Sequence, residues 1–256
     1  MSAARELTDP RILRAAESFF HGFTLHRSRT HPYIITRTEG LTILHDAPRK
    51  KLKDVRRAEV ITIDRAPKEV HSGSERLNAE HPRWSLAAIY SDEASLESVE
   101  SEYRALGYRL IAREAFFTHE HHELPKVNSN LTRRITSSEE MEMYARATGR
   151  KPYRSADIEG QFPKIRCYYS VSEETVVGGV ATILTPNDTF WVSNLWVTEE
   201  RRREGRATAM MAQLLQDNDK AGPAMTVLLS SKAGAYLYPR LGFEQIGTLL
   251  LYQPPK

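Results

Sequence analysis

An arginine-rich loop is the part of the sequence whose residue types and spacing point most directly to chemistry. It runs from Val197 to Thr208 and places Gly205 immediately before an amphipathic stretch. The first N–H groups of a helix lack partners within the helix, and the helix dipole adds partial positive charge at that end. Four arginines in the loop add full charges: Arg201, Arg202, Arg203 and Arg206. The loop is therefore predicted to bind an anion such as phosphate.

The elements on either side of the loop must position it. The segment 189–197 is aromatic and β-branched, which predicts a buried strand, and residues 205–217 have apolar side chains at helical spacing. Gly222-Pro223 is a typical helix end, and residues 225–230 are predicted to form a second apolar strand. An arginine-rich turn alone is more often a solvated surface. The order strand, loop, helix is what favours a binding site.

Two spaced motifs resemble one known family. Arg202-x-x-Gly205-x-Ala207 follows the predicted strand end, and Tyr238-Pro-Arg-Leu-Gly-Phe243 follows a predicted short helix, 232–238, and opens a last strand. In order and spacing the two motifs are similar to those of the GNAT superfamily of acyl-CoA-dependent N-acyltransferases. The resemblance covers about half of the chain, residues 131–256.

The resemblance implies an α/β fold with a mixed, mostly antiparallel sheet flanked by helices. It implies an N-acetyltransferase that moves an acetyl group from acetyl-CoA to a primary amine by direct attack in a ternary complex. The strand before the loop would pair with the pantetheine arm, the amides of Arg203 through Thr208 would surround the pyrophosphate, and a bulge is expected at Ser193-Asn194. The residues assigned to the cofactor in this way are Leu195, Trp196, Val197, Arg202, Arg203, Glu204, Gly205, Arg206, Ala207 and Thr208.

Acyl transfer to an amine also needs an acid and a base. Tyr238 matches the family's usual acid position, and a phenol with a pKa of about 10 can donate to a thiolate whose pKa is about 8.5. The alternative is that Tyr238 only packs between the last helix and the sheet. No ionisable residue lies in 190–197, where several family members have a carboxylate. The base is left open between Glu159, Asp157 and an ordered water.

The acceptor is expected to be a small-molecule amine or a peptide amine. In the family the stretch 150–163 lies over the acceptor site, and Tyr153, Arg154, Asp157 and Glu159 are the candidate contacts. The alternative is an ordinary surface loop. The identity of the acceptor, and whether the acyl group is longer than acetyl, stay open.

The N-terminal half is predicted to be a second α/β unit. The polar run 119–130 reads as a linker, which places an N-terminal domain at 1–122 and the acetyltransferase domain at 128–256. Strand 83–90, helix 93–106 and strand 107–118 repeat the element order of the C-terminal end.

Leu106-Gly107-Tyr108 matches Leu241-Gly242-Phe243, so the half is interpreted as a degenerate copy. No anion loop follows its strand 58–64. It could cover the acceptor groove, hold the neighbouring domain or form a homodimer surface, and the sequence leaves these open.

Composition excludes several other classes. The chain has 256 residues, 40% of them hydrophobic, and a net charge of only +3. The basic run 49–57 lacks interleaved aromatics, so no nucleic-acid partner is expected. Cys167 lies in an alternating strand and is predicted to be a small buried hydrophobe, and a single cysteine suits a reducing compartment. No apolar run reaches the roughly 18 residues of a membrane span, so a cytoplasmic protein without membrane contact is expected.

No metal site is expected, because His119, His121 and His122 share no helical face with Glu120 and Glu123. The alternative function is a catalytically inactive acyl-CoA-binding sensor or partner-binding module, which the missing strand carboxylate favours. A protein without any cofactor would require both motifs to be coincidences.

Overall fold

The computed structural model describes residues 9–38, 40–48, 55–160, 163–232 and 234–255. Most of the basic run 49–57 lies outside the described residues. The N-terminal half begins with a long helix and continues with strands and short helices: α1 (Pro10–Arg27), β1 (Tyr33–Thr38), β2 (Leu41–Asp46), β3 (Ala58–Ile63), α2 (Pro67–Ser72), α3 (Ser74–Glu80), β4 (Trp84–Tyr90), α4 (Leu96–Ala105) and β5 (Arg109–His119).

The C-terminal half has a related order, with two short helices in place of α1, one longer helix in place of α2 and α3, and, among the described residues, no α-helix between its last two strands. Its elements are β6 (Arg133–Arg134), α5 (Ser138–Thr148), α6 (Ser155–Ile158), β7 (Ile165–Ser172), β8 (Thr175–Thr185), β9 (Thr189–Val197), α7 (Arg206–Asp219), β10 (Thr226–Ser231) and β11 (Glu244–Gln253). Short 3₁₀ turns precede α4, β6, α7 and β11: η2 (Glu93–Ser95), η3 (Ser129–Leu131), η4 (Glu199–Arg201) and η5 (Pro239–Leu241).

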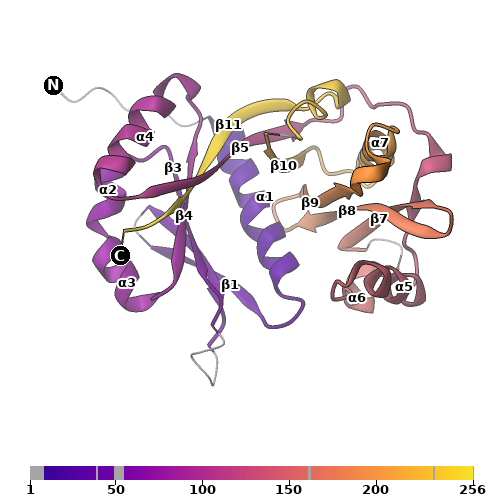
Figure 1. Ribbon diagram of the computed structural model, residues 1–256, viewed down its shortest axis with the longest axis horizontal. Helices are drawn as coiled ribbons and strands as arrows, with labels where there is room; N and C mark the ends of the chain where they lie inside the picture. Colours follow the sequence, from indigo (N-terminus) through magenta and orange to yellow (C-terminus); the bar gives the residue numbers. More distant parts are fainter. Residues whose placement is uncertain (1–8, 39, 49–54, 161–162, 233, 256) are drawn as a thin grey trace.

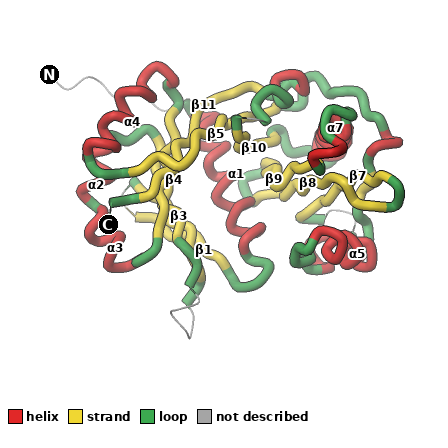
Figure 2. Tube along the Cα trace, viewed as in Figure 1, coloured by secondary structure: helices red, strands yellow, loops and turns green. Residues whose placement is uncertain are grey.

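All described strands join one 11-stranded sheet in the order β1-β2-β3-β4-β11-β5-β10-β9-β8-β7-β6. Figure 2 shows these strands as one band across the molecule. Among the described strands, the pairs β3–β4 and β9–β10 are parallel and the others are antiparallel. The predicted mixed, mostly antiparallel sheet flanked by helices is therefore confirmed.

The two halves exchange a strand at the centre of the sheet. The last strand, β11, lies between β4 and β5, with Thr248 opposite Tyr90. In turn β5 lies between β11 and β10, with Thr226 opposite His119. Each half thus completes its sheet with a strand from the other. The boundary at residues 122–128 remains a prediction, but it does not separate two independent sheets.

Helices cover both faces of the sheet. In Figure 1, α1 lies at the centre, between the two halves. One apolar core on the α1 side runs through both halves, from Tyr33 and Leu44 to Tyr144 and Trp191. The other face has two separate cores, one under α2 to α4 and one under α7. The prediction that Cys167 is buried is confirmed, since it is 3% exposed. Trp84 and Tyr103 are buried in the same way, at 3% and 0% exposed.

Local sequence signals account for the ends of the helices near the site. The Ser137 hydroxyl accepts a hydrogen bond from the Glu140 amide and caps α5, and Gly149 ends that helix with a left-handed φ of 66°. The predicted short helix at 232–238 is wrong. The described residues there form turns, followed by the η5 turn, because Gly234 and Pro239 disfavour a continuous helix in so short a segment.

Among the described residues, no helix combines the length and the apolar character needed to cross a membrane.

Candidate active site

A cleft opens where the parallel strands β9 and β10 separate. Their pairing is limited to Thr226 opposite Phe190 and Val227 opposite Trp191, although both strands continue beyond these residues. The cleft has a volume of about 550 Å³ and is lined by residues 192–197 of β9 and 228–231 of β10. This volume is typical of a site for a small molecule or cofactor. Backbone groups that would otherwise bond between the strands are therefore available to a ligand.

A β-bulge shapes the β9 side of the cleft. Ala181 of β8 lies opposite Ser193, whereas Gly179 lies opposite Trp196, so β9 has an additional residue in this stretch. Asn194 has a φ of 56°, a left-handed conformation that asparagine tolerates better than most residues. The bulge expected at Ser193-Asn194 is confirmed. It re-aims the backbone of β9 at the point where the strand leaves β10.

Consecutive backbone amides stand unpaired at the entrance to α7. Gly205 is the residue before the helix, with a φ of 77°, and no side chain caps this end. The N–H groups of Arg203 through Thr208 donate to none of the described residues, and the next amide, that of Ala209, bonds to the Gly205 carbonyl. A series of free amides at a helix start is the arrangement that binds phosphate oxygens.

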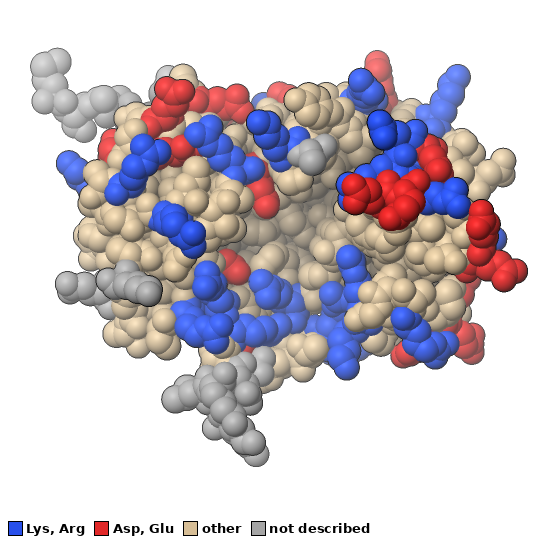
Figure 3. Space-filling view, in the orientation of Figure 1, with Lys and Arg blue, Asp and Glu red and all other residues tan. Residues whose placement is uncertain are grey.

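The arginines of the loop divide into two groups. Arg201 pairs with Glu173 at 3.2 Å. Arg202 and Arg203 are exposed and form no ion pair with the described residues, and Arg202 lines the cleft. Acidic side chains share the surface over α7, where Figure 3 shows a mixture of both signs. The loop is thus less positive than its arginines alone suggested.

Arg206 requires a correction. We expected its side chain to add charge to the loop, but it is only 8% exposed and points into the protein. Its Nη1 donates to the Ser170 hydroxyl and the Val171 carbonyl, both at 2.9 Å, and its Nε donates to Glu204 at 2.8 Å. The side chain therefore fastens α7 to β7. The amide of Arg206 remains one of the free N–H groups.

Of the ten residues assigned to the cofactor, the structure places five on the wall of the cleft: Leu195, Trp196, Val197, Arg202 and Ala207. Glu204, Arg203, Gly205, Arg206 and Thr208 lie beside it, in the loop and the first turn of α7. The side chains of Leu195 and Val197 pack on the α7 core, whereas Trp196 packs on the opposite face. β9 thus presents side chains to both faces of the sheet at the cleft.

Tyr238 lies in the wall of the same cleft. Its ring packs against Phe117 and Phe243, and burial raises the pKa of its hydroxyl to about 12. No described residue accepts a hydrogen bond from this hydroxyl. Among the described residues that line the cleft, only Arg202 and Tyr238 are ionisable. At neutral pH Tyr238 is therefore a protonated group that can supply a proton inside the cleft.

The two carboxylates considered as a base lie outside the lining of the cleft. Glu159 accepts hydrogen bonds from the amide and hydroxyl of Ser138, at the start of α5. Asp157 pairs with Arg154 at 3.1 Å. Both carboxylates are occupied by local contacts of α5 and α6, so the structure brings neither of them to Tyr238.

Tyr153, from the expected acceptor segment, does approach the bulge, through a histidine that the sequence reasoning missed. His26 Nδ1 lies 2.7 Å from the Tyr153 hydroxyl, and His26 Nε2 lies 2.9 Å from the Asn194 amide. His26 comes from α1, 168 residues before Asn194 in the chain. No sequence motif could have indicated this contact, because it depends on how α1 packs against β9.

The equivalent strands of the N-terminal half form no such cleft. β3 and β4 stay paired over six residues, from Ala58 opposite Trp84 to Ile63 opposite Ile89. The sequence analysis found no anion loop after β3, and in the structure β3 and β4 also remain paired. In the described part of the chain, the cleft between β9 and β10 is the one where separated strands, free amides and a buried phenol coincide.

Comparison with known families supports this location. Residues 163–245 match the family model described as an acetyltransferase (GNAT) domain. The matched segment includes β7 to β10, α7 and Tyr238. A search of curated protein sequences finds no match.

Solved structures with similar folds cover nearly the whole chain. A GCN5-related N-acetyltransferase from Kribbella flavida has a TM-score of 0.64 at 17% identity, covering 95% of this chain and 96% of its own. A GCN5-related N-acetyltransferase from Sphaerobacter thermophilus has a TM-score of 0.55 at 14% identity, covering 85% and 78%. A GCN5-related N-acetyltransferase-like protein from Streptococcus suis has a TM-score of 0.51 at 13% identity, covering 96% and 99%. At these identities the likeness establishes a shared fold.

Proposed function

We propose that the protein transfers an acetyl group from acetyl-CoA to a primary amine, on the premise that residues 163–245 match the acetyltransferase (GNAT) domain model. The domain supports acyl transfer in general. The more specific proposal, acetyl transfer from acetyl-CoA to a primary amine, rests on three features that occur together at one cleft. These are the separation of β9 from β10, the free amides of Arg203 through Thr208 and the hydroxyl of the largely buried Tyr238.

The residues present fit coenzyme A. The free amides and the exposed side chains of Arg202 and Arg203 suit its phosphates. The unpaired edge of β9, at Leu195 to Val197, suits an extended arm that bonds like an added strand. When bound, acetyl-CoA would supply the activated acyl group as a thioester.

The chain's own residues then have two tasks. The bulge at Asn194 directs the backbone of β9 toward the reacting end of the cleft, where amides can stabilise negative charge. Tyr238 holds a proton on its hydroxyl for the departing thiolate. Since Glu159 and Asp157 are engaged elsewhere, we infer that the amine loses its proton to water. Direct attack is favoured over an acyl-enzyme because Cys167 is buried, and burial raises the pKa of its thiol to about 12.

Calorimetric titration with acetyl-CoA tests the cofactor site. We expect micromolar binding to the wild type and its loss in Gly205→Glu, which adds a carboxylate among the free amides. Gly222→Glu is the matched control, since both glycines have positive φ and open space around them, and Gly222 lies beyond the far end of α7.

Thiol release with a panel of amines then tests the reaction. Failure of the wild type to bind acetyl-CoA, or equal loss in both glycine variants, would contradict the site. Binding without turnover on any amine would favour the inactive sensor.

A further inference from the structure

A cluster of basic and aromatic side chains surrounds the bulge on the face of the sheet opposite α7. Tyr144 and Tyr153 belong to the core on that face, and Trp196 packs against it. Arg150, directly after α5, has its guanidinium 5.5 Å from the centre of the Trp196 ring, and Arg29 lies 4.8 Å from the Tyr153 ring. Arg29 and His26 come from the N-terminal half. The cluster therefore joins both halves of the chain at one position on β9.

His26 in this cluster is neutral. Its Nε2 lies 3.0 Å from Arg29 Nη2, and since a guanidinium only donates, Nε2 must accept. The Asn194 amide donates to the same nitrogen at 2.9 Å. Burial, followed by the charges of Arg29 and Arg150, lowers the pKa of His26 to about 3. His26 is thus a poor base, and its contacts instead hold Asn194 in place.

Two positive charges in the cluster lack a carboxylate partner. Arg27, at the end of α1, pairs with Glu59 at 3.4 Å. Neither Arg29 nor Arg150 lies within ion-pair distance of any described carboxylate, and both are only half-buried. Arg29 donates to backbone carbonyls of His26 and Lys151, which satisfies hydrogen bonds without neutralising the charge. Figure 3 shows the molecule hollowed between its halves, with Lys and Arg gathered along the lower margin.

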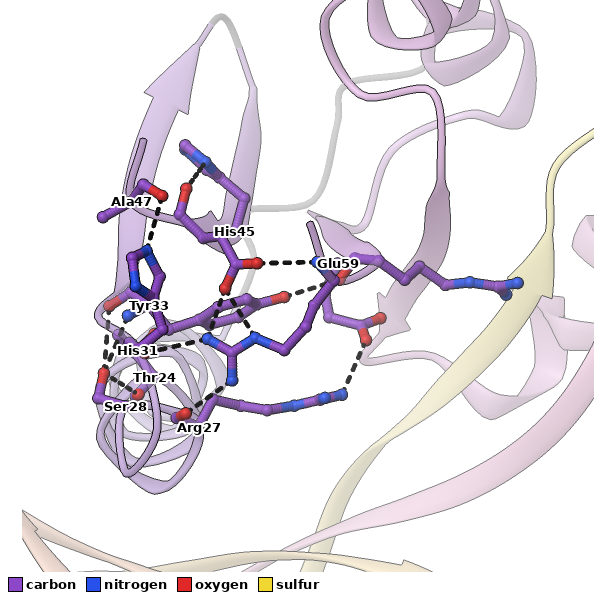
Figure 4. Close-up of polar contacts among 11 residues, drawn as sticks. Thr24, Arg27, Ser28, His31, Tyr33, His45, Ala47 and Glu59 are labelled. Atoms are coloured by element: carbon purple, nitrogen blue, oxygen red, sulfur yellow. Dashed lines mark hydrogen bonds and ion pairs between the residues drawn. The ribbon is translucent and has the colours of Figure 1, made fainter. Parts of the chain in front are cut away.

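The segment that carries Arg29 is held by Arg56, which lies just before β3. Arg56 donates to the Arg27 carbonyl at 2.7 Å and to the His31 carbonyl at 3.0 Å, and its Nε donates to Asp46 at 2.7 Å. Asp46 is 5% exposed, so the carboxylate of this ion pair is buried, whereas Arg56 is partly exposed. Figure 4 shows these bonds converging on the end of α1. Arg29 is therefore held on a rigid support, as a binding residue should be.

We propose that Arg150 and Arg29 form a subsite for an anionic group of the acceptor, which is then an amine that also carries a carboxylate or phosphate. This inference rests on the proposed acetyltransferase function. The α7 loop lies on the other face of the sheet, so an acceptor can reach the bulge from the α1 side while the cofactor occupies the cleft. An anion there would pair with two uncompensated guanidinium groups, an interaction that favours charged over neutral ligands.

Paired amines test the subsite directly. We would compare the kcat/KM of a panel of amino acids with that of their own amides, and of O-phosphoethanolamine with that of ethanolamine, at saturating acetyl-CoA. We expect the anionic member of at least one pair type to be preferred by about tenfold or more. The two pair types distinguish a carboxylate from a phosphate. Equal rates within every pair would overturn the inference and leave the acetyltransferase proposal intact.

Variants of Arg150 test whether this residue causes the preference for anionic acceptors. Arg150→Gln should raise the acceptor's KM about tenfold and remove most of the preference, without changing the KM for acetyl-CoA. Arg150→Lys should retain part of the preference for the anionic acceptor. Arg146→Gln is the matched control, because Arg146 is exposed one turn earlier on α5. A rise in the KM for acetyl-CoA instead would assign Arg150 to the cofactor and overturn the subsite.

A binding measurement separates failure of the subsite from failure of the chemistry. The protein saturated with coenzyme A would be titrated with N-acetylglycine and with N-acetylglycinamide. Tighter binding of the acid, lost in Arg150→Gln, supports the subsite even if no amine is acetylated, an outcome that would contradict only the proposed reaction. Indifference to the carboxylate in this titration would contradict the subsite whatever the turnover.

Discussion

Burial decides the role of individual side chains at the site. Arg202 and Arg206 are four residues apart in one loop, yet Arg202 is exposed at the cleft and Arg206 is buried against β7. A substitution such as Arg206→Glu would therefore place a carboxylate among buried acceptors and disturb the fold, so it cannot report on cofactor binding alone. Tyr238 is also buried, but its hydroxyl has no hydrogen-bond partner among the described residues, and the residue lines a cleft.

Tyr238→Phe should lower kcat by about 10²- to 10⁴-fold, because it removes the proton donor and little else. Its aromatic contacts with Phe117 and Phe243 do not require the hydroxyl. Steady-state kinetics and calorimetry should show slower turnover with the Kd for acetyl-CoA unchanged.

Tyr236→Phe is the control for this change, since Tyr236 is two residues away and 76% exposed. An unchanged kcat in Tyr238→Phe across the pH range would assign Tyr238 to packing alone.

Close contacts between elements place the bulge. Gly22 of α1 faces Trp191 of β9, and a Cβ at this position would overlap the indole ring. The absence of a side chain lets α1 approach β9 closely enough for His26, one turn later, to reach Asn194. On β8, a Cβ at Gly179 would overlap the Tyr144 hydroxyl, which accepts a hydrogen bond from Trp196. Gly178 and Gly179 thus allow side chains and backbone of neighbouring elements to approach β8 closely.

Gly22→Ala should destabilise the protein by about 1–3 kcal/mol, the range for overpacking a well-packed contact. In an exposed helix the same change would stabilise the protein by up to about 1 kcal/mol. A loss of stability would therefore indicate close packing at Gly22. Denaturant unfolding measures it. Leu13→Ala, at a residue of α1 that is 47% exposed, should change the free energy of unfolding by less than about 0.5 kcal/mol. A stabilised Gly22→Ala variant would contradict the close packing of α1 on β9.

The exchange of strands makes the whole molecule one cooperative unit. β10 pairs with β5 from Thr226 to Ser231, and β11 pairs with both β4 and β5. The apolar core on the α1 side also runs through both halves. Separation of the halves would expose unpaired strand edges and apolar surface, which favour aggregation.

Residues 128–256 expressed alone should therefore be insoluble or lack a cooperative unfolding transition, although they contain the whole segment that matches the acetyltransferase family model. Co-expression with residues 1–127 should restore a soluble complex that binds acetyl-CoA. Circular dichroism with thermal unfolding measures both cases. A stable isolated fragment that binds acetyl-CoA as tightly as the full chain would show that the exchanged strands are dispensable.

Local patterns in the sequence were sufficient to predict β9, the loop that follows it, α7 and the position of Tyr238. Their signals act over a few residues: alternation of apolar side chains, a glycine with positive φ before α7 and the caps of α5. The prediction of a short helix at 232–238 is wrong because its apolar pattern is weak and Gly234 and Pro239 override it.

Only the tertiary structure decided the exchange of β5 and β11, the burial of Arg206 and the meeting of His26, Arg29 and Arg150 at the bulge. The strand exchange and the cluster at the bulge join segments more than 100 residues apart, and Arg206 bonds to residues 35 and 36 positions earlier in the chain. No local propensity encodes such pairings. They follow from how the sheet minimises unpaired edges and how α1 buries its apolar face. The sequence by itself thus determined the elements that form the cleft between β9 and β10, and the packing of the two halves decided which residues surround the bulge at Asn194.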